Sequence, residues 1–84
     1  EHMQEIDALI EPKLKNWKLS RLSRVSLSVL RMAVYELKYD KDVPTGVAIN
    51  EAVELSKKYS DEAVTKMING VLDNIYHNED LDER

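Results

Sequence analysis

The chain has 84 residues, a formal net charge of −4, two histidines and no cysteine. A chain of this length forms at most one small domain. The lack of cysteine excludes disulfides, thiolate metal sites and cysteine nucleophiles, and it is consistent with a cytoplasmic protein. Because no run approaches the roughly 20 apolar residues that span a bilayer, we expect neither membrane insertion nor secretion.

Apolar residues recur with helical spacing along the chain, which predicts an all-α fold, a small bundle of about four helices. The first helix is expected over residues 3–16, kinked or restarted at Pro12, because the proline ring excludes a backbone hydrogen bond. Its apolar face consists of Ile6, Leu9, Ile10 and Leu14. Residues 17–23 are expected to form a connection anchored by Trp17, Leu19 and Leu22, with Trp17 interpreted as a core residue.

The second helix is predicted from Arg24 to Tyr39, with Ser23 or Ser26 as its N-cap. Its apolar stripe steps by three and four residues through Leu27, Leu30, Val34 and Leu37. The third helix is predicted from Pro44 to Lys58, because proline suits the first turn of a helix.

The fourth helix is predicted to begin after an N-cap at Ser60 and to run to about Tyr76. The dipeptide Asn69-Gly70 could form a hairpin turn, but one helical period continues across it, so a helix is expected. Gly70 should cost about 1 kcal/mol relative to alanine, and we expect another helix backbone to approach closely there. Asn50 and Asn69 are interpreted as buried amides that join helices.

Positive charge is strongly segregated along the chain. Residues 12–35 contain six basic residues and no acidic one, although the whole chain is acidic. The alternative is an ordinary solvated helix face whose partners are carboxylates elsewhere in the fold. The better functional interpretation is a phosphate-binding surface, because lysine and arginine neutralise phosphates and an aromatic plane can stack unpaired bases. The candidate residues in this stretch are Lys18, Arg21 and Arg24, beside Trp17.

Other chemistries lack their usual residues. The carboxylates Glu51 and Glu54, or Glu36 and Asp40, could share a helix face, but they lie among lysines, and a catalytic role is not expected. No metal or cofactor is expected. A helix-turn-helix reading of the last two helices is weak, because Lys66 is the only lysine or arginine in the fourth helix.

Three ordered segments resemble the NusB family of bacterial transcription antitermination factors. They are residues 30–37 (LRMAVYEL), residues 42–57 (DVPTGVAINEAVELSK) and residues 69–73 (NGVLD). The similarity extends over about residues 5–76 and implies the C-terminal half of an all-helical fold. On this basis, residues 4–77 are interpreted as the domain, residues 1–3 as a cloning remnant and residues 78–84 as an acidic, frayed tail.

The resemblance implies binding of boxA-type RNA together with a small-subunit ribosomal protein, NusE, in the antitermination complex of RNA polymerase. Residues near the start of the last helix would touch RNA, which adds Lys66 and Met67 to the candidate sites. Met67 replaces the phenylalanine usual in the family, Ser26 stands where an acidic residue is common, and Ala63 replaces an acidic or polar residue of some members. The family's arginine-rich N-terminal segment is not matched.

Two other functions stay open at this point. One is the NusB-like RNA-binding domain of a ribosomal-RNA cytosine methyltransferase, and the other is a helical protein-interaction module without RNA binding. We also expect the chain to form a homodimer, because the absence of a partner half would expose apolar helix faces.

Overall fold

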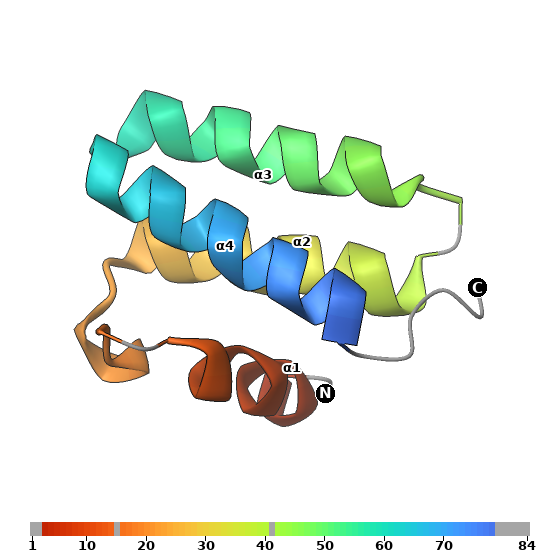
Figure 1. Ribbon diagram of the computed structural model, residues 1–84, viewed down its shortest axis with the longest axis horizontal. Coiled ribbons are helices and arrows are strands. Elements are labelled where there is room, and N and C mark those ends of the chain that lie inside the picture. Colours follow the sequence, from red (N-terminus) through yellow and green to blue (C-terminus); the bar gives the residue numbers. More distant parts are fainter. Residues whose placement is uncertain (1–2, 15, 41, 79–84) are drawn as a thin grey trace.

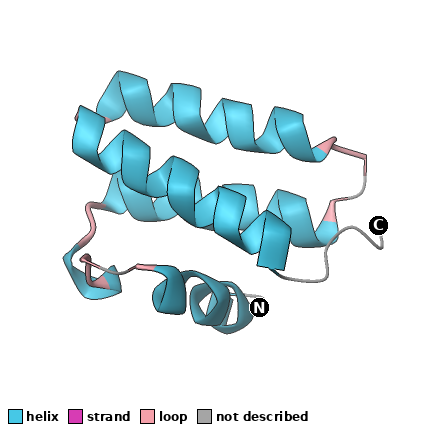
Figure 2. Ribbon diagram, viewed as in Figure 1, coloured by secondary structure: helices cyan, strands magenta, loops and turns pink. Residues whose placement is uncertain are grey.

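The computed structural model describes residues 3–14, 16–40 and 42–78, and these residues form an all-α bundle (Figures 1 and 2). The predicted fold class is therefore confirmed. Four α-helices and two short 3₁₀ turns follow one another along the chain. In chain order they are α1 (Met3–Ile10), η1 (Glu11–Lys13), η2 (Leu19–Arg21), α2 (Arg24–Tyr39), α3 (Thr45–Tyr59) and α4 (Glu62–Asn78).

The three long helices α2, α3 and α4 pack side by side with alternating chain direction, and α1 lies across α2 and α4 (Figure 1). One continuous core fills the space between them, built from the predicted apolar stripes. None of the described helices is long and apolar enough to cross a bilayer. The core residues are Ile6, Ile10, Leu14, Val29, Leu30, Ala33, Val34, Leu37, Ala48, Ala52, Ile68, Val71, Leu72 and Ile75.

Helix α2 has the predicted bounds, and Ser23 is its N-cap, since the Ser23 hydroxyl accepts a hydrogen bond from the backbone N–H of Ser26 at 3.1 Å. The predicted first helix is shorter than expected. It ends at Ile10, and Pro12 lies in the 3₁₀ turn η1, because proline cannot supply the backbone donor that an α-helix needs.

The fourth helix begins two residues after the predicted N-cap. Ser60 is the C-cap of α3, so its expected role at α4 is wrong. Asp61 caps α4 instead, because its carboxylate accepts a hydrogen bond from the backbone N–H of Val64 at 2.9 Å. Of the residues assigned to the two ends of the chain, Met3 begins α1 and Asn78 ends α4, while residues 1, 2 and 79–84 lie outside the described part.

Two polar contacts hold α1 against α2. The guanidinium of Arg31 donates two hydrogen bonds to Asp7, at 2.9 and 2.8 Å, and the hydroxyl of Tyr39 donates one to Glu5. The hydrogen bond to Glu5 is the main reason why the pKa of Tyr39 is raised to about 12. Since α1 is short, these bonds supplement the burial of Ile6 and Ile10 in fixing its position.

The amides of Asn50 and Asn69 are exposed, so their predicted burial between helices is wrong. The close helix approach expected at Gly70 is also wrong. Gly70 lies on the exposed side of α4, and a Cβ built there would meet nothing within 4 Å. Asn50, Asn69 and Gly70 all fit the helical pattern of the sequence. They are exposed because neighbouring helices cover only one side of α3 and of α4, and these residues lie on the uncovered side.

We expect Gly70→Ala to stabilise the protein by about 0.5–1 kcal/mol, because alanine restricts the unfolded chain and favours a helix. No glycine among the described residues has a positive φ, and the new methyl group would enter open space. Thermal unfolding should show a rise in Tm of roughly 2–8 °C. Gly46→Ala is the matched control, with a smaller expected gain because Gly46 lies in the first turn of α3. A lower Tm for Gly70→Ala would contradict the prediction.

Candidate nucleic-acid interface

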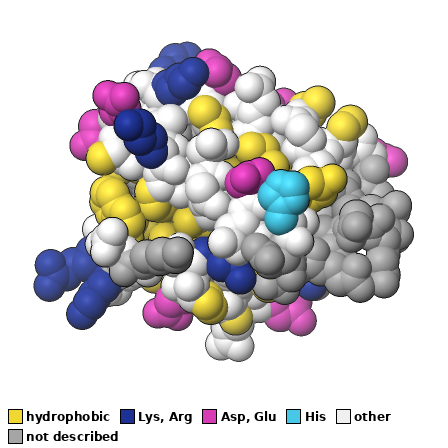
Figure 3. All heavy atoms as spheres, viewed as in Figure 1, with side chains coloured by type: hydrophobic (Ala, Val, Ile, Leu, Met, Phe, Trp, Pro, Cys, Tyr) yellow, Lys and Arg dark blue, Asp and Glu magenta, His cyan; other side chains and the backbone are white. Residues whose placement is uncertain are grey.

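The connection between η1 and α2, described over residues 16–23, presents the basic residues Lys18 and Arg21 to solvent. Leu19 and Leu22 hold this connection in place by packing against the core, as predicted. Neither Lys18 nor Arg21 forms an ion pair with any carboxylate in the described part of the chain. Lysine and arginine side chains gather at the edge of the molecule where this connection lies (Figure 3). Two cations are thus available to an external anion.

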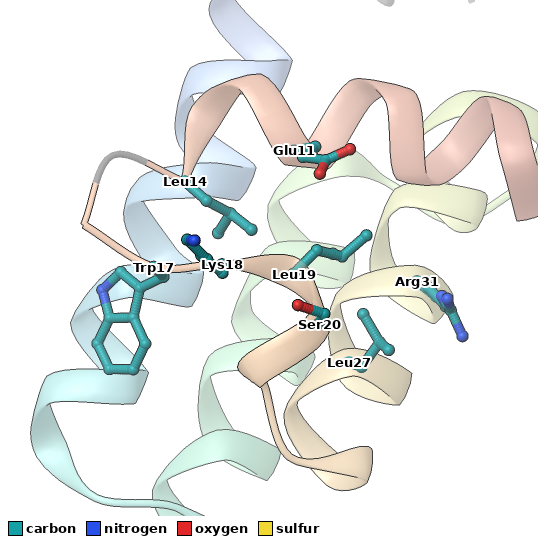
Figure 4. Close-up of a pocket in the computed structure, with 8 residues that line it drawn as sticks. All are labelled: Glu11, Leu14, Trp17, Lys18, Leu19, Ser20, Leu27 and Arg31. Atoms are coloured by element: carbon teal, nitrogen blue, oxygen red, sulfur yellow. The ribbon is translucent and has the colours of Figure 1, made fainter.

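Trp17 is 36% exposed, and the prediction that it is a core residue is wrong. Trp17 lines two surface hollows. The first, called here the Lys18 hollow, has a volume of about 530 Å³, and Figure 4 shows the indole at one end of it and Arg31 at the other. The Lys18 hollow is lined by Glu11, Leu14, Trp17, Lys18, Leu19, Ser20, Leu27 and Arg31.

The second hollow lies between α4 and the chain segment that contains Lys13, Asn16 and Trp17. This indole groove has a volume of about 290 Å³ and contains two of the predicted site residues, Lys66 and Met67. Lys66 is exposed, and Met67 is half-buried against the core. The groove is lined by Lys13, Asn16, Trp17, Lys66, Met67, Gly70, Val71 and Asn74. Tertiary packing therefore brings the basic stretch next to the only lysine of α4.

Two basic residues near these hollows are paired with carboxylates. Arg31 makes the bidentate contact with Asp7, whose hydrogen bond raises the pKa of the guanidinium. That contact is half-buried, so Arg31 acts as a structural cation. Lys66 lies 3.8 Å from Glu62, but both side chains are more than three-quarters exposed. Such a solvated pair contributes about 0–1 kcal/mol, and Lys66 can exchange Glu62 for another anion.

Arg24 lies at a different groove from the other predicted site residues. It is at the start of α2 and lines an apolar hollow of about 290 Å³ between α2 and α3. Val25, Met32 and Tyr59 are among its exposed apolar residues. The structure thus brings Lys66 and Met67 together in the indole groove beside Trp17, puts Lys18 in the other hollow that Trp17 lines, and places Arg24 on the α2–α3 groove.

Sequence reasoning missed the part that Lys13 and Asn16 play in the indole groove. Lys13 belongs to the basic stretch, but nothing in the helical pattern indicates that it faces α4. The described residues contain no group of three histidine, cysteine or carboxylate side chains able to hold a metal ion. What the geometry offers is exposed cations, a half-exposed indole and shallow grooves.

The exposed cations, the indole and the shallow grooves define this protein as a small all-α bundle with a surface suited to binding an external partner. The sequence profile of the NusB family matches residues 1–77, and the chain belongs to that family. The transcription antitermination protein NusB of Listeria monocytogenes is 61% identical over 71 residues, which cover 84% of this chain and 56% of the relative. The NusB of Clostridium perfringens is 53% identical over 78 residues, or 93% of this chain and 58% of the relative.

The solved structure of T. maritima NusB matches the fold with a TM-score of 0.88 and 44% sequence identity. The match covers 98% of this chain and 58% of the T. maritima chain. The chain therefore spans less than three fifths of the length of these relatives. The family assignment made from three sequence segments is confirmed.

Proposed function

We propose that this chain is an RNA-binding and protein-binding part of a transcription antitermination factor and has no enzymatic activity. It binds boxA-type RNA together with the ribosomal protein NusE, as part of the antitermination complex that accompanies RNA polymerase on ribosomal RNA operons in the cytoplasm. Its relatives are named as transcription antitermination proteins, which supports the general role.

The observation on which the RNA-binding proposal depends is the position of Lys18 and Arg21. Both are exposed, neither is paired with a described carboxylate, and both lie on the connection that borders the indole groove. An RNA phosphate that reaches them does not have to displace a protein carboxylate. Lys66 and Met67 lie on α4 in the indole groove, and Trp17 lines both this groove and the hollow that contains Lys18.

The α2–α3 groove supports the protein-binding part of the proposal. Its lining is mainly apolar, and exposed apolar patches on helices are typical of protein contacts. Met32 is 49% exposed and Tyr59 is 61% exposed, so a partner could bury both. Arg24 at the end of this groove fits a contact with NusE better than a contact with the RNA bound at Lys66. The expected homodimer would compete for the same apolar surface.

The double variant Lys18→Ala/Arg21→Ala tests the RNA-binding proposal. Fluorescence anisotropy with a labelled boxA-type RNA, measured over a salt series with and without NusE, gives both the affinity and its salt dependence. We expect roughly tenfold weaker binding at moderate salt, and a log–log salt slope reduced by about 1.4, because each lost phosphate contact on a single strand removes about 0.7.

The matched control is Lys57→Ala/Lys58→Ala, which removes the same charge from exposed positions on α3. This control should retain most of the RNA affinity. If both double variants weaken binding equally, charge alone is responsible and the assigned surface is wrong. If the parent chain has no RNA affinity either with or without NusE, the proposed function is wrong.

A further inference from the structure

Trp17 is unusual among the aromatic residues of this chain, because it lines two hollows that both contain basic residues. One hollow contains Lys13 and Lys66, and the other contains Lys18. It is also the only tryptophan of the chain. A large apolar ring that is 36% exposed gains little for the folded state from its exposed part. That part is available to a ligand.

The two hollows differ from an ordinary apolar protein contact. The indole groove is lined by polar and charged side chains as well as by Trp17 and Met67, and its rim includes the amides Asn16 and Asn74. Among the described residues, Glu11 is the only acidic one that lines either hollow, and it lies at the Lys18 hollow. An aromatic ring that borders two hollows with lysines suits a nucleotide, because the flat base can stack on the ring while its phosphates meet the lysines.

We infer that the indole of Trp17 is the stacking platform for one unpaired base of the bound RNA. This inference rests on the proposed RNA-binding function and assigns a base contact to it. The flanking phosphates then lie toward Lys66 in one hollow and Lys18 in the other. A paired base cannot occupy this position, because both of its faces are already covered in the duplex.

The residues around Trp17 restrict where its indole can lie before RNA binds. Leu14, before Trp17 in the chain, is buried, and Leu19, after it, packs against the core. Met67 and Val71 of α4 line the far wall of the indole groove, and Gly70 leaves it open because no side chain projects there. Anchoring of these neighbours limits the positions open to the indole and so lowers the ordering cost of binding.

The sole tryptophan gives a direct readout of stacking. Titration of the 84-residue chain with a boxA-type single-stranded RNA should quench the Trp17 emission over the same concentration range in which anisotropy of the labelled RNA reports binding. Trp17→Leu should weaken binding roughly tenfold, and Trp17→Phe should recover much of the loss, because a base stacks on any aromatic ring. The same RNA annealed to its complement should cause little quenching.

Tyr35→Leu is the control, since Tyr35 is an exposed aromatic residue on α2 that lines neither hollow and is not part of the α2–α3 groove. It should leave RNA affinity unchanged, and circular dichroism should show that each variant is folded. If RNA binds but Trp17 emission is unchanged and Trp17→Leu binds normally, the stacking inference is wrong while the proposed function stands. If Trp17→Phe is as weak as a folded Trp17→Leu, stacking is also excluded. If no RNA binds the parent chain, the proposed function fails and the inference fails with it.

Discussion

Leu72→Ala is expected to lower the free energy of unfolding by about 2–5 kcal/mol. Leu72 lies on α4 and is fully buried among residues of the common core. The substitution removes apolar contacts and leaves a cavity that rigid helices on all sides cannot fill completely. A domain of this length has a total stability of roughly 4–13 kcal/mol, so this single change removes a large part of it.

Urea denaturation followed by circular dichroism measures this loss. The slope of the transition should stay the same and the midpoint should fall, because the variant still unfolds in one step. The control is Met32→Ala, which shortens an apolar side chain that is 49% exposed on α2 and should change stability by less than about 0.5 kcal/mol. Equal losses in the two variants would show that the core is not where the structure places it.

Ser56→Ala is expected to destabilise the protein by about 1–3 kcal/mol, although alanine is the better helix former. Ser56 is fully buried on α3, and its hydroxyl lies 2.9 Å from the hydroxyl of Thr65 on α4. Removing one hydroxyl leaves the other without its partner inside the bundle. The cost comes from the desolvated hydroxyl that remains.

The double variant Ser56→Ala/Thr65→Val should be much closer to the parent chain in stability than Ser56→Ala is. When both hydroxyls are replaced by apolar groups of similar shape, no buried polar group is left unsatisfied. A double-mutant cycle by urea denaturation measures the coupling between the two positions. Additive losses from Ser56→Ala and Thr65→Val would contradict this explanation, because independent sites do not compensate each other.

The apolar period was enough to predict where the helices lie. In α2 the stripe through Leu30, Val34 and Leu37 gives both the element and the buried face, because residues three and four apart share one side of a helix. The spacing of apolar residues did not predict burial correctly where a residue's environment depends on another helix. Asn69 and Gly70 of α4 are exposed, whereas Ser56 of α3 is buried, and nothing in the local pattern separates these cases.

The candidate site, like the fold, was predicted only in part from the sequence. Segregation of charge in residues 12–35 predicted a basic surface, and the exposed positions of Lys18 and Arg21 agree with it. Arg31, in the same stretch, is instead bound to Asp7 of α1. Only the packing of helices decides which cation meets a carboxylate, because ion-pair partners can lie far apart in the sequence.

By itself, the sequence determined the all-helical class, the core stripes and the family of this protein, since these depend on local spacing and on ordered blocks of residues. The tertiary structure alone decided that Trp17 is 36% exposed and lines one hollow with Lys18 and another with Lys66. The physical reason is that a side chain's exposure depends on what packs over it. In this chain the groove beside Trp17 exists only because α4 returns to lie next to the connection before α2.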